Sequence, residues 1–268
     1  MKSRQLSSKK LWYYLLPWVL PSVLIGFWFI AGHAQLVPPY LLPPPTEIIA
    51  TGQEYIFGES GQAPFSGRFA QDAMVSCVRV MAGFSIAVIF GLPLGIISGR
   101  VKVIQQLLGT SVNALRAVPG IAWLPLAMVW FGIGMKTTIF LVAMAAFFPI
   151  YLNAAAGAAQ VNLLLLQAGA MMGVNRIRGT FFILLPAAMP NIITGLRLGL
   201  GISWAYLVLG ELSGVSNGLG AVIMDARMLG RIDMIVVGII LIAIIGRASD
   251  LLLQSGLKIC FKSAARMI

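Results

Sequence analysis

The chain has 268 residues, of which 59% are hydrophobic and only 10% are charged. A soluble domain of this length carries about a quarter charged residues, so the composition excludes an ordinary soluble protein and indicates an integral membrane protein. The formal net charge of +11 does not indicate a nucleic-acid partner. The basic residues gather at the chain ends and between apolar runs, which is the usual mark of loops on the cytoplasmic side of a bilayer.

Six apolar runs are long enough, or nearly long enough, to cross a bilayer core that needs about 20 helical residues. They are about Leu11–Ala31, Met74–Ser98, Val118–Phe131, Thr137–Ala158, Ile192–Leu209 and Ile232–Leu253. The third run is short and is broken by Pro119, Gly120 and Pro125. Such breaks are tolerated at membrane depth only against protein or a water-filled cavity, so we expect this span inside the bundle. The predicted fold class is an all-α membrane protein with six transmembrane helices.

Charge predicts the orientation of these spans. Four basic residues place the N-terminus in the cytoplasm, and six crossings return the C-terminus there; the four are Lys2, Arg4, Lys9 and Lys10. We expect one transmembrane domain over residues 1–268, with a tail at 1–10, a six-helix core at about 11–253 and a loop on the outer side at about 35–73. A cleaved signal peptide is the alternative for the first run, but its 21 residues exceed the roughly 7–15 of a signal core.

Within this outer loop, Thr46 precedes an apolar pattern from Ile48 to Ile56. The pattern predicts a surface helix capped by Thr46, with a plain connector as the alternative. Cys77 and Cys260 fall toward opposite membrane faces in this topology, so we do not expect them to pair.

Residues 160–190 separate the fourth and fifth predicted spans. Apolar residues at helical spacing predict a helix over Gln160–Met172 that is apolar on more than one face and must bury both. Gly173 is suited to end this helix in a left-handed conformation, and Asn175 is suited to cap a second helix. Pro186 is expected to end or kink that second helix.

An ordinary amphipathic loop on the lipid headgroups, with Arg176 and Arg178 reaching anionic lipid, is the alternative for residues 160–190. The spacing of the segment favours another interpretation. Gln167-Ala168-Gly169 is followed after three residues by Gly173 and after nine more by Ile183-Leu184-Leu185-Pro186. This spacing resembles the motif Glu-Ala-Ala, three residues, Gly, nine residues, Ile-x-Leu-Pro of permeases in importers driven by an ATP-binding cassette. Gln167 replaces the Glu and Gly169 the second Ala.

The resemblance extends over roughly Leu42 to Leu257. Stretches such as "LRAVPGIAWLPLAMVWFGIG" and "LPAAMPNIITGLRLGLGISW" are similar to permeases of the sulfonate, taurine and nitrate/bicarbonate importer group. The resemblance implies a type I ABC importer permease fold in the bacterial inner (plasma) membrane, with residues 160–190 as a cytoplasmic coupling-helix loop and residues 35–73 as a periplasmic loop. The residues it assigns to ATPase coupling are Gln167, Ala168, Gly169, Gly173, Asn175, Arg176, Arg178 and Pro186.

The resemblance also implies the partners. They are a second copy of the chain in a homodimer, two cytoplasmic ATP-binding cassette subunits, a periplasmic solute-binding protein and the lipid bilayer. The chain contains no P-loop spacing, GxxxxGK[ST], so ATP and Mg are expected on the partner subunits and no cofactor in this chain. The single histidine, His33, has no cysteine or carboxylate cluster beside it. No metal site and no catalytic group are predicted, and the chain is not expected to be an enzyme.

Ionisable residues within apolar runs need a partner or a function. Arg79 could bind an oxyanion through a charge-assisted hydrogen bond, and packing or an ion pair between spans is the alternative. Glu211 could contact a docked binding protein, close an outer gate or be a solvated end residue. Arg247 and Asp250 are expected to pair, and Arg197 to snorkel or to brace the 160–190 segment. Candidates for the substrate pathway are Arg79, Trp123, Ser203, Trp204, Tyr206 and Glu211.

The predicted function is translocation of a small anion, of the sulfonate/taurine or nitrate/bicarbonate type, delivered by the binding protein. An ion-gradient-driven secondary transporter is the alternative. That class should carry acidic residues near the bilayer midplane, whereas Glu211 and Asp250 lie near span ends. A membrane enzyme would need a catalytic cluster, which the sequence does not offer.

Overall fold

The computed structural model describes residues 5–34, 38, 40–59 and 61–260, and the side chains of residues 5–15, His33 and Cys260 lie outside this description. The predictions for the tail charges, for His33 and for a Cys77–Cys260 pair therefore lie outside the described residues. Within the described part the chain is helical, without a strand. It forms two compact units, one of Met1–Arg68 with Asp225–Gly238 and the other of Phe69–Met224 with Ile239–Ile268.

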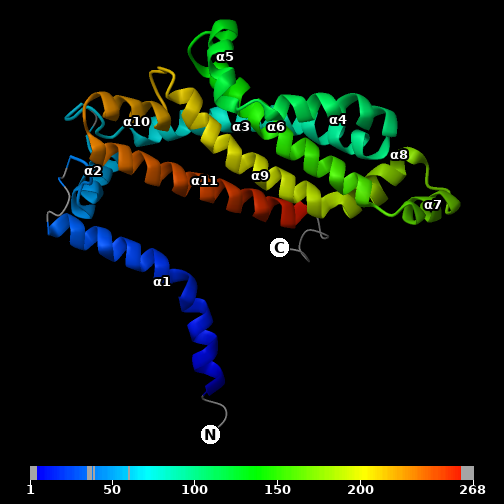
Figure 1. The fold of residues 1–268 in the computed structure, drawn as a ribbon, viewed down its shortest axis with the longest axis horizontal. Coiled ribbons are helices and arrows are strands. Elements are labelled where there is room, and N and C mark those ends of the chain that lie inside the picture. Colours follow the sequence, from blue (N-terminus) through cyan, green and yellow to red (C-terminus); the bar gives the residue numbers. More distant parts are fainter. Residues whose placement is uncertain (1–4, 35–37, 39, 60, 261–268) are drawn as a thin grey trace. The chain divides into compact units, whose positions relative to one another are not determined.

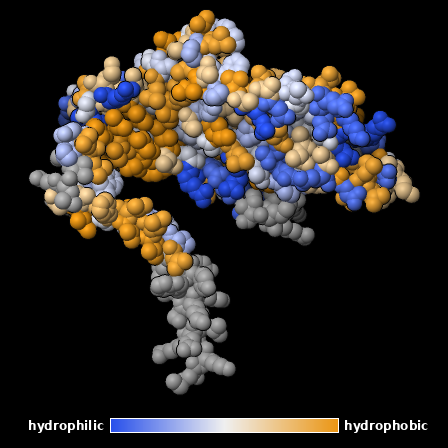
Figure 2. All heavy atoms as spheres, viewed as in Figure 1, coloured by the Kyte–Doolittle hydropathy of each residue, from blue (hydrophilic) through white to orange (hydrophobic). Residues whose placement is uncertain are grey.

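The first unit contains the N-terminal helix α1 (Gln5–His33) and the loop helix α2 (Pro45–Phe57). The described side chains of α1 are almost all apolar and exposed, as Figure 2 shows along this helix. The prediction of a helix in the outer loop is confirmed, but the predicted cap is wrong. Pro44 occupies the cap position and Pro45 the first helical position, where the missing N–H of proline costs nothing because no helical carbonyl would accept it.

The same unit includes the start of α11 (Ile232–Cys260). The carboxylate of Asp233 accepts a hydrogen bond from the Thr51 hydroxyl at 2.7 Å and lies 2.6 Å from Nη2 of Arg231. This ion pair raises the pKa of the Arg231 guanidinium further above its ordinary value. The hydrogen bond from Thr51 to Asp233 joins the start of α11 to α2 within this unit.

The all-helical membrane class is confirmed. Four helices in the described residues are long and apolar enough to cross a membrane: α3 (Phe69–Arg100), α6 (Met135–Gln160), a continuous helix over Arg176–Glu211, and Ile232–Ile259 of α11. A fifth is obtained if two helical segments bent by 91°, Lys102–Ala117 and Gly120–Phe131, are one broken span. Of the first predicted span, Leu16–Gly32 is a shorter apolar helix.

The second unit is built on α3, α6 and α9 (Leu185–Glu211), which run side by side (Figure 1). A stripe of three glycines on α3 lets the backbones of α3 and α6 approach: Gly91, Gly95 and Gly99. A Cβ atom at Gly95 would lie 2.5 Å from the Tyr151 carbonyl oxygen and 2.8 Å from the Ala154 Cβ. Small residues at such spacing are the usual means of close helix packing in membranes, where no hydrophobic force drives helices together.

The third predicted span differs most from expectation. A helix that was taken for a loop, α4 (Lys102–Ala117), precedes it, and the span itself is a 3-10 turn, η1 (Gly120–Trp123), followed by the short α5 (Leu124–Phe131). The prediction that this span lies inside the bundle is wrong for the single chain. Only Ala127 of α5 is buried, and Val129 is 81% exposed.

Two further helices complete the chain, α7 (Leu163–Met171) and α10 (Leu219–Met228). The short α8 (Arg176–Gly179) and a π-helical turn, η2 (Thr180–Leu184), lead directly into α9. Of the two alternatives for Pro186, an end or a kink of the second helix, the end is wrong. Pro186 lies in the first turn of α9 and the helix continues through it, because the π turn before it adapts the hydrogen bonding.

Candidate functional site

The 160–190 segment is held in shape by two asparagine caps and one glycine. The Asn162 side chain accepts the Leu164 N–H at 2.9 Å and starts α7. The Asn175 side chain accepts the Arg178 N–H at 2.8 Å and starts α8. Between them Gly173 has a φ of +82°, a conformation that glycine adopts without steric cost. The predicted turn and second cap are confirmed. The Asn162 cap was missed, although an asparagine before a run of leucines is a cap signal.

One departure from the Glu-Ala-Ala motif has a structural reason. Gly169 is the only buried residue of α7, and a Cβ atom there would overlap the Cδ1 atom of Ile183 in the π turn. An alanine at this position would require the end of the Ile183 side chain to move, because the other neighbouring atoms lie about 4 Å away. Gln167 and Ala168, by contrast, are exposed, so the other departure, the uncharged Gln167, changes the surface and leaves the packing as it is.

Much of the segment's surface is apolar. Figure 2 shows hydrophobic residues over α7 beside hydrophilic residues over α8. Met171 is 89% exposed and Phe182 is 77% exposed. The other large apolar side chains exposed there are Leu163, Leu164, Leu165, Met172, Ile177 and Phe181. The predicted helix with more than one apolar face is therefore present, and most of that apolar surface is not covered by the part of the chain that the structure describes.

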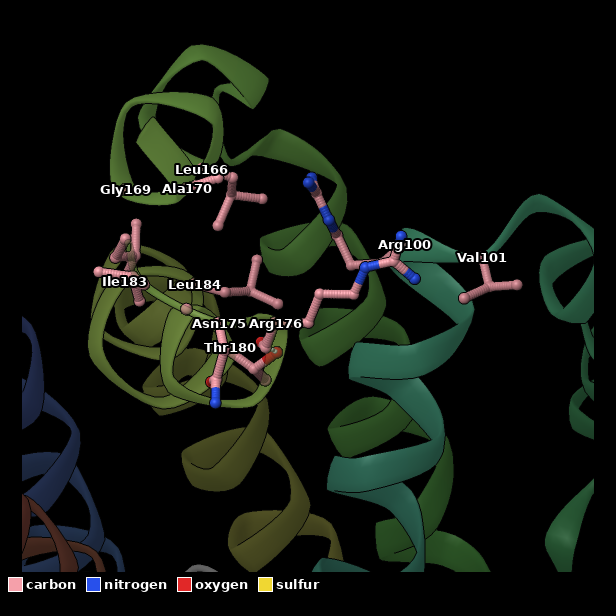
Figure 3. A pocket seen from close by; sticks show the side chains of 12 residues that line it. Arg100, Val101, Leu166, Gly169, Ala170, Asn175, Arg176, Thr180, Ile183 and Leu184 are labelled. Carbon is pink, nitrogen blue, oxygen red and sulfur yellow. Dashed lines mark hydrogen bonds between the residues drawn. The ribbon is translucent and has the colours of Figure 1, made fainter. Parts of the chain in front are cut away.

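A cavity of about 370 Å³ opens between α7, the α8–η2 turn and the junction of α3 with α4. Figure 3 shows Leu166 of α7, Ile183 and Leu184 of the η2 turn, Arg176 of α8 and Arg100 at the end of α3 among the residues that line it. Arg100 also donates to the carbonyl oxygens of Ala158 and Val161 at 3.4 and 3.3 Å. The cavity is thus lined mainly by apolar side chains, together with two arginines.

A buried ion-pair cluster lies at the other end of α9. Nη1 of Arg79 lies 2.6 Å from Oε1 of Glu211, and the side chains are 5% and 0% exposed. The Glu211 carboxylate also accepts hydrogen bonds from the Ser76 hydroxyl at 2.8 Å and the Gly220 N–H at 2.8 Å. Arg79 donates further to the backbone and side-chain oxygens of Asn217. Of the alternatives, the ion pair between spans is present, and a solvated Glu211 is wrong.

Two other pathway candidates have their polar atoms engaged inside the second unit. The Ser203 hydroxyl donates to the Gly199 carbonyl at 2.8 Å, and the Trp204 Nε1 donates to the Ser249 hydroxyl at 2.9 Å. Trp123 differs, because its Nε1 is buried and has no hydrogen-bond partner within the described residues. A Cβ atom at Gly120 would overlap the Tyr206 hydroxyl. Tyr206 therefore packs closely on the turn that contains Trp123.

Asp250 joins two arginines. It lies 3.0 Å from Nη1 of Arg247, as predicted, and 3.0 Å from Nε of Arg197 on α9. Gln254 donates to the same carboxylate at 2.8 Å. Arg197 was expected to snorkel or to brace the 160–190 segment. The pairing across 53 residues of sequence was missed, since nothing local in the sequence indicates it.

The family comparison decides the class of the protein. Residues 91–255 match the model of the binding-protein-dependent transport system inner membrane component. The chain belongs to this family. It is therefore a membrane-spanning permease of a transport system, and membership favours the ATP-driven importer over an ion-gradient-driven transporter.

Three curated relatives support the assignment. The taurine transport system permease protein TauC of Escherichia coli is 35% identical over 88% of this chain and 84% of its own length. A Bacillus subtilis permease protein named for aliphatic sulfonates transport, SsuC, is 36% identical over 87% and 81%. The nitrate import permease protein NrtB of Synechocystis is 35% identical over 65% and 64%. The predicted resemblance to this group is confirmed.

The fold has a counterpart among solved structures. A chain of the MetNI methionine ABC transporter in an inward-facing conformation superposes with a TM-score of 0.57 at 19% identity. The match covers 70% of this chain and 95% of that chain. At this identity the likeness concerns the fold alone, and it confirms the predicted type I importer architecture.

Proposed function

We propose that the protein is the permease of an ATP-driven importer for a small anion, with the organosulfonates and nitrate as the substrate class. The names of the relatives in E. coli, B. subtilis and Synechocystis support this class. Delivery by a periplasmic solute-binding protein follows from the same proposal. The chain lies in the bacterial inner membrane with both termini cytoplasmic, as the distribution of basic residues indicates.

The single observation that carries the mechanism is the shape of the 160–190 segment. Two capped helices and a left-handed glycine present a large apolar surface that the chain does not cover. Exposed apolar surface of this kind marks a protein contact. We assign it to contact with a cytoplasmic ATPase subunit that hydrolyses ATP with Mg, through Gln167, Ala168, Gly169, Gly173, Asn175, Arg176, Arg178 and Pro186.

A homodimer with two ATPase subunits completes the transporter. In a twofold dimer the same surface meets itself, and the exposed apolar side chains of α5, such as Val129 and Trp130, suit such an interface. Among the pathway candidates, Trp123 and Tyr206 suit substrate contact best. The other four candidates form hydrogen bonds within the chain through their polar side-chain groups: Arg79, Ser203, Trp204 and Glu211. We assign them a supporting function beside the pathway.

Uptake by reconstituted vesicles tests the proposal. The permease is incorporated with an ATPase subunit, and the binding protein and radiolabelled taurine are added on the other side. We expect uptake only with all three components and ATP, and competition by alkanesulfonates or nitrate. Uptake of the anion on a proton or sodium gradient without the ATPase subunit would contradict the proposal and support the secondary transporter.

A further inference from the structure

The acidic residues of this chain are distributed very unevenly. Between Asp72 and Glu211 the sequence contains no aspartate or glutamate. Asp250 on α11 is held by Arg197, Arg247 and Gln254. The 160–190 segment therefore contains two cations, Arg176 and Arg178. It contains no carboxylate that could neutralise them.

The cavity beside α7 places one of these cations, Arg176, and Arg100 of α3 among apolar side chains. Arg100 and Arg176 line it together with Leu166, Ile183 and Leu184 (Figure 3). Neither arginine forms an ion pair with any described residue. The volume, about 370 Å³, falls at the lower end of the roughly 300–1,000 Å³ typical of ligand pockets. It is large enough for a side chain and too apolar to favour a hydrated inorganic ion.

The surroundings of the cavity indicate a protein as the occupant. Met171, Ile177 and Phe182 of the same segment are also exposed, and large exposed apolar surface marks protein contacts. Arginine binds a carboxylate through two parallel hydrogen bonds, which are strong and directional when water is excluded. An apolar side chain next to an aspartate or glutamate matches this lining of the cavity.

We propose that this cavity receives an apolar side chain of the ATPase subunit, and that a neighbouring carboxylate of that subunit pairs with Arg176 and Arg100. The inference rests on the proposed function, since it names the chemistry by which the ATPase is bound. In this contact the permease supplies the positive charge through arginine, and the ATPase subunit supplies the negative charge through aspartate or glutamate. Gln167 is uncharged and contributes none.

The test measures assembly of the purified permease, in a zwitterionic detergent, with the ATPase subunit that supports its ATP-dependent uptake. Arg176→Glu should weaken assembly about tenfold or more, which corresponds to about 1.4 kcal/mol. Lys102→Glu is the matched control. It makes the same charge change at the first residue of α4, next to Val101 in the cavity wall but outside the cavity, where an acid suits the helix N-terminus. It should change assembly less than about twofold.

A second variant tests the apolar part of the cavity lining. Ala170 lines it, so Ala170→Phe should fill it and weaken assembly without any charge change, while Ala170→Ser should assemble as the wild type does. Single Asp→Arg or Glu→Arg changes on the ATPase docking face should include one that restores assembly with Arg176→Glu.

Three outcomes would overturn the inference. One is equal assembly of the Arg176→Glu and Lys102→Glu variants, together with normal assembly of Ala170→Phe. Another is an Arg176→Glu defect that occurs only in vesicles of anionic lipid, which would assign the arginine to lipid headgroups. The third is failure of the wild-type chain itself to assemble with any ATPase subunit, which would overturn the proposed function as well. In the first two cases ATP-driven uptake by the wild type is intact, and the proposed function stands.

Discussion

Arg79 on α3 and Glu211 at the end of α9 form an ion pair with 2.6 Å between Nη1 and Oε1, although 132 residues separate them in sequence. The pair closes a cluster in which Ser76 also donates to Glu211 and its hydroxyl oxygen accepts the Leu219 N–H at 2.9 Å. Asp72 accepts the Gly218 N–H at 3.0 Å. The cluster thereby binds the loop after α9 to α3. A group that a sequence would suggest for anion binding instead holds two helices and a loop together.

Removing one partner of this pair should be costly. Glu211→Gln leaves Arg79 buried with its charge unpaired, and such changes cost about 3–5 kcal/mol. Thermal unfolding of the purified protein in detergent should show a large fall in midpoint. The double variant Arg79→Met/Glu211→Leu should recover much of it, because no buried charge remains. Arg247→Met, which removes an exposed partner of Asp250, should cost under about 1 kcal/mol. A midpoint for Glu211→Gln equal to that of Arg247→Met would contradict the structural importance of the cluster.

Gly173 should tolerate asparagine better than valine. Its φ of +82° costs an ordinary residue roughly 1–2 kcal/mol, and asparagine visits this region routinely. No neighbouring atom limits space at this position, so the backbone conformation alone decides. Gly173→Val should insert in the membrane normally yet lose ATP-driven uptake or assembly with the ATPase, while Gly173→Asn should retain most of both. Comparable uptake by the two variants would show that the turn does not need its left-handed conformation.

The glycine stripe on α3 should be intolerant of large side chains. Gly95→Leu must displace α6, because even a Cβ atom would lie 2.5 Å from the Tyr151 carbonyl oxygen. Overpacking of this kind costs typically about 1–3 kcal/mol and here moves backbone as well. Gly109→Leu on α4 is the control, since nothing lies within 4 Å of its Cβ position. Unfolding in detergent and yield of folded protein measure the difference. Equal stability of the two variants would mean that α3 and α6 do not pack as described.

Trp123 and Trp204 should respond differently to loss of the indole N–H. Trp123 Nε1 has no partner among the described residues, so Trp123→Phe should raise the KM for anion uptake several-fold with little change in stability if that N–H faces the substrate. Trp204 donates to Ser249, so Trp204→Phe should lower stability by about 1 kcal/mol and leave KM unchanged. Uptake kinetics and unfolding on the same preparations separate the two. An unchanged KM for Trp123→Phe would remove this residue from the pathway.

Features set by one short stretch of chain could be predicted from the sequence. Gly173 and Asn175 adopt the predicted conformations because a left-handed turn and a helix cap depend on the residue type itself. The prediction failed where a proline was taken as a stop. Pro186 lies in the first turn of α9, where its ring is compatible with the helix and a π turn precedes it.

Features set by distant parts of the chain could not be predicted. The pairing of Arg197 with Asp250 depends on how α9 and α11 meet, which no local pattern encodes. The exposure of α5 could not be predicted either. A helix inside a bundle and a helix that contacts lipid or a second protein have the same apolar composition. For Gly169 the motif marked the position as important, and its close contact with the end of the Ile183 side chain is visible only in the structure.

The helix from Arg176 to Glu211 has a mechanical consequence. Its 36 residues extend roughly 54 Å at 1.5 Å per residue, with one end in the proposed motor contact and the other locked in the Arg79 cluster. A rigid helix cannot tilt at one end without displacing the other. A movement of α8 would therefore also displace the loop after α9. The π turn at Thr180–Leu184 is the one departure from regular α-helical hydrogen bonding along that helix.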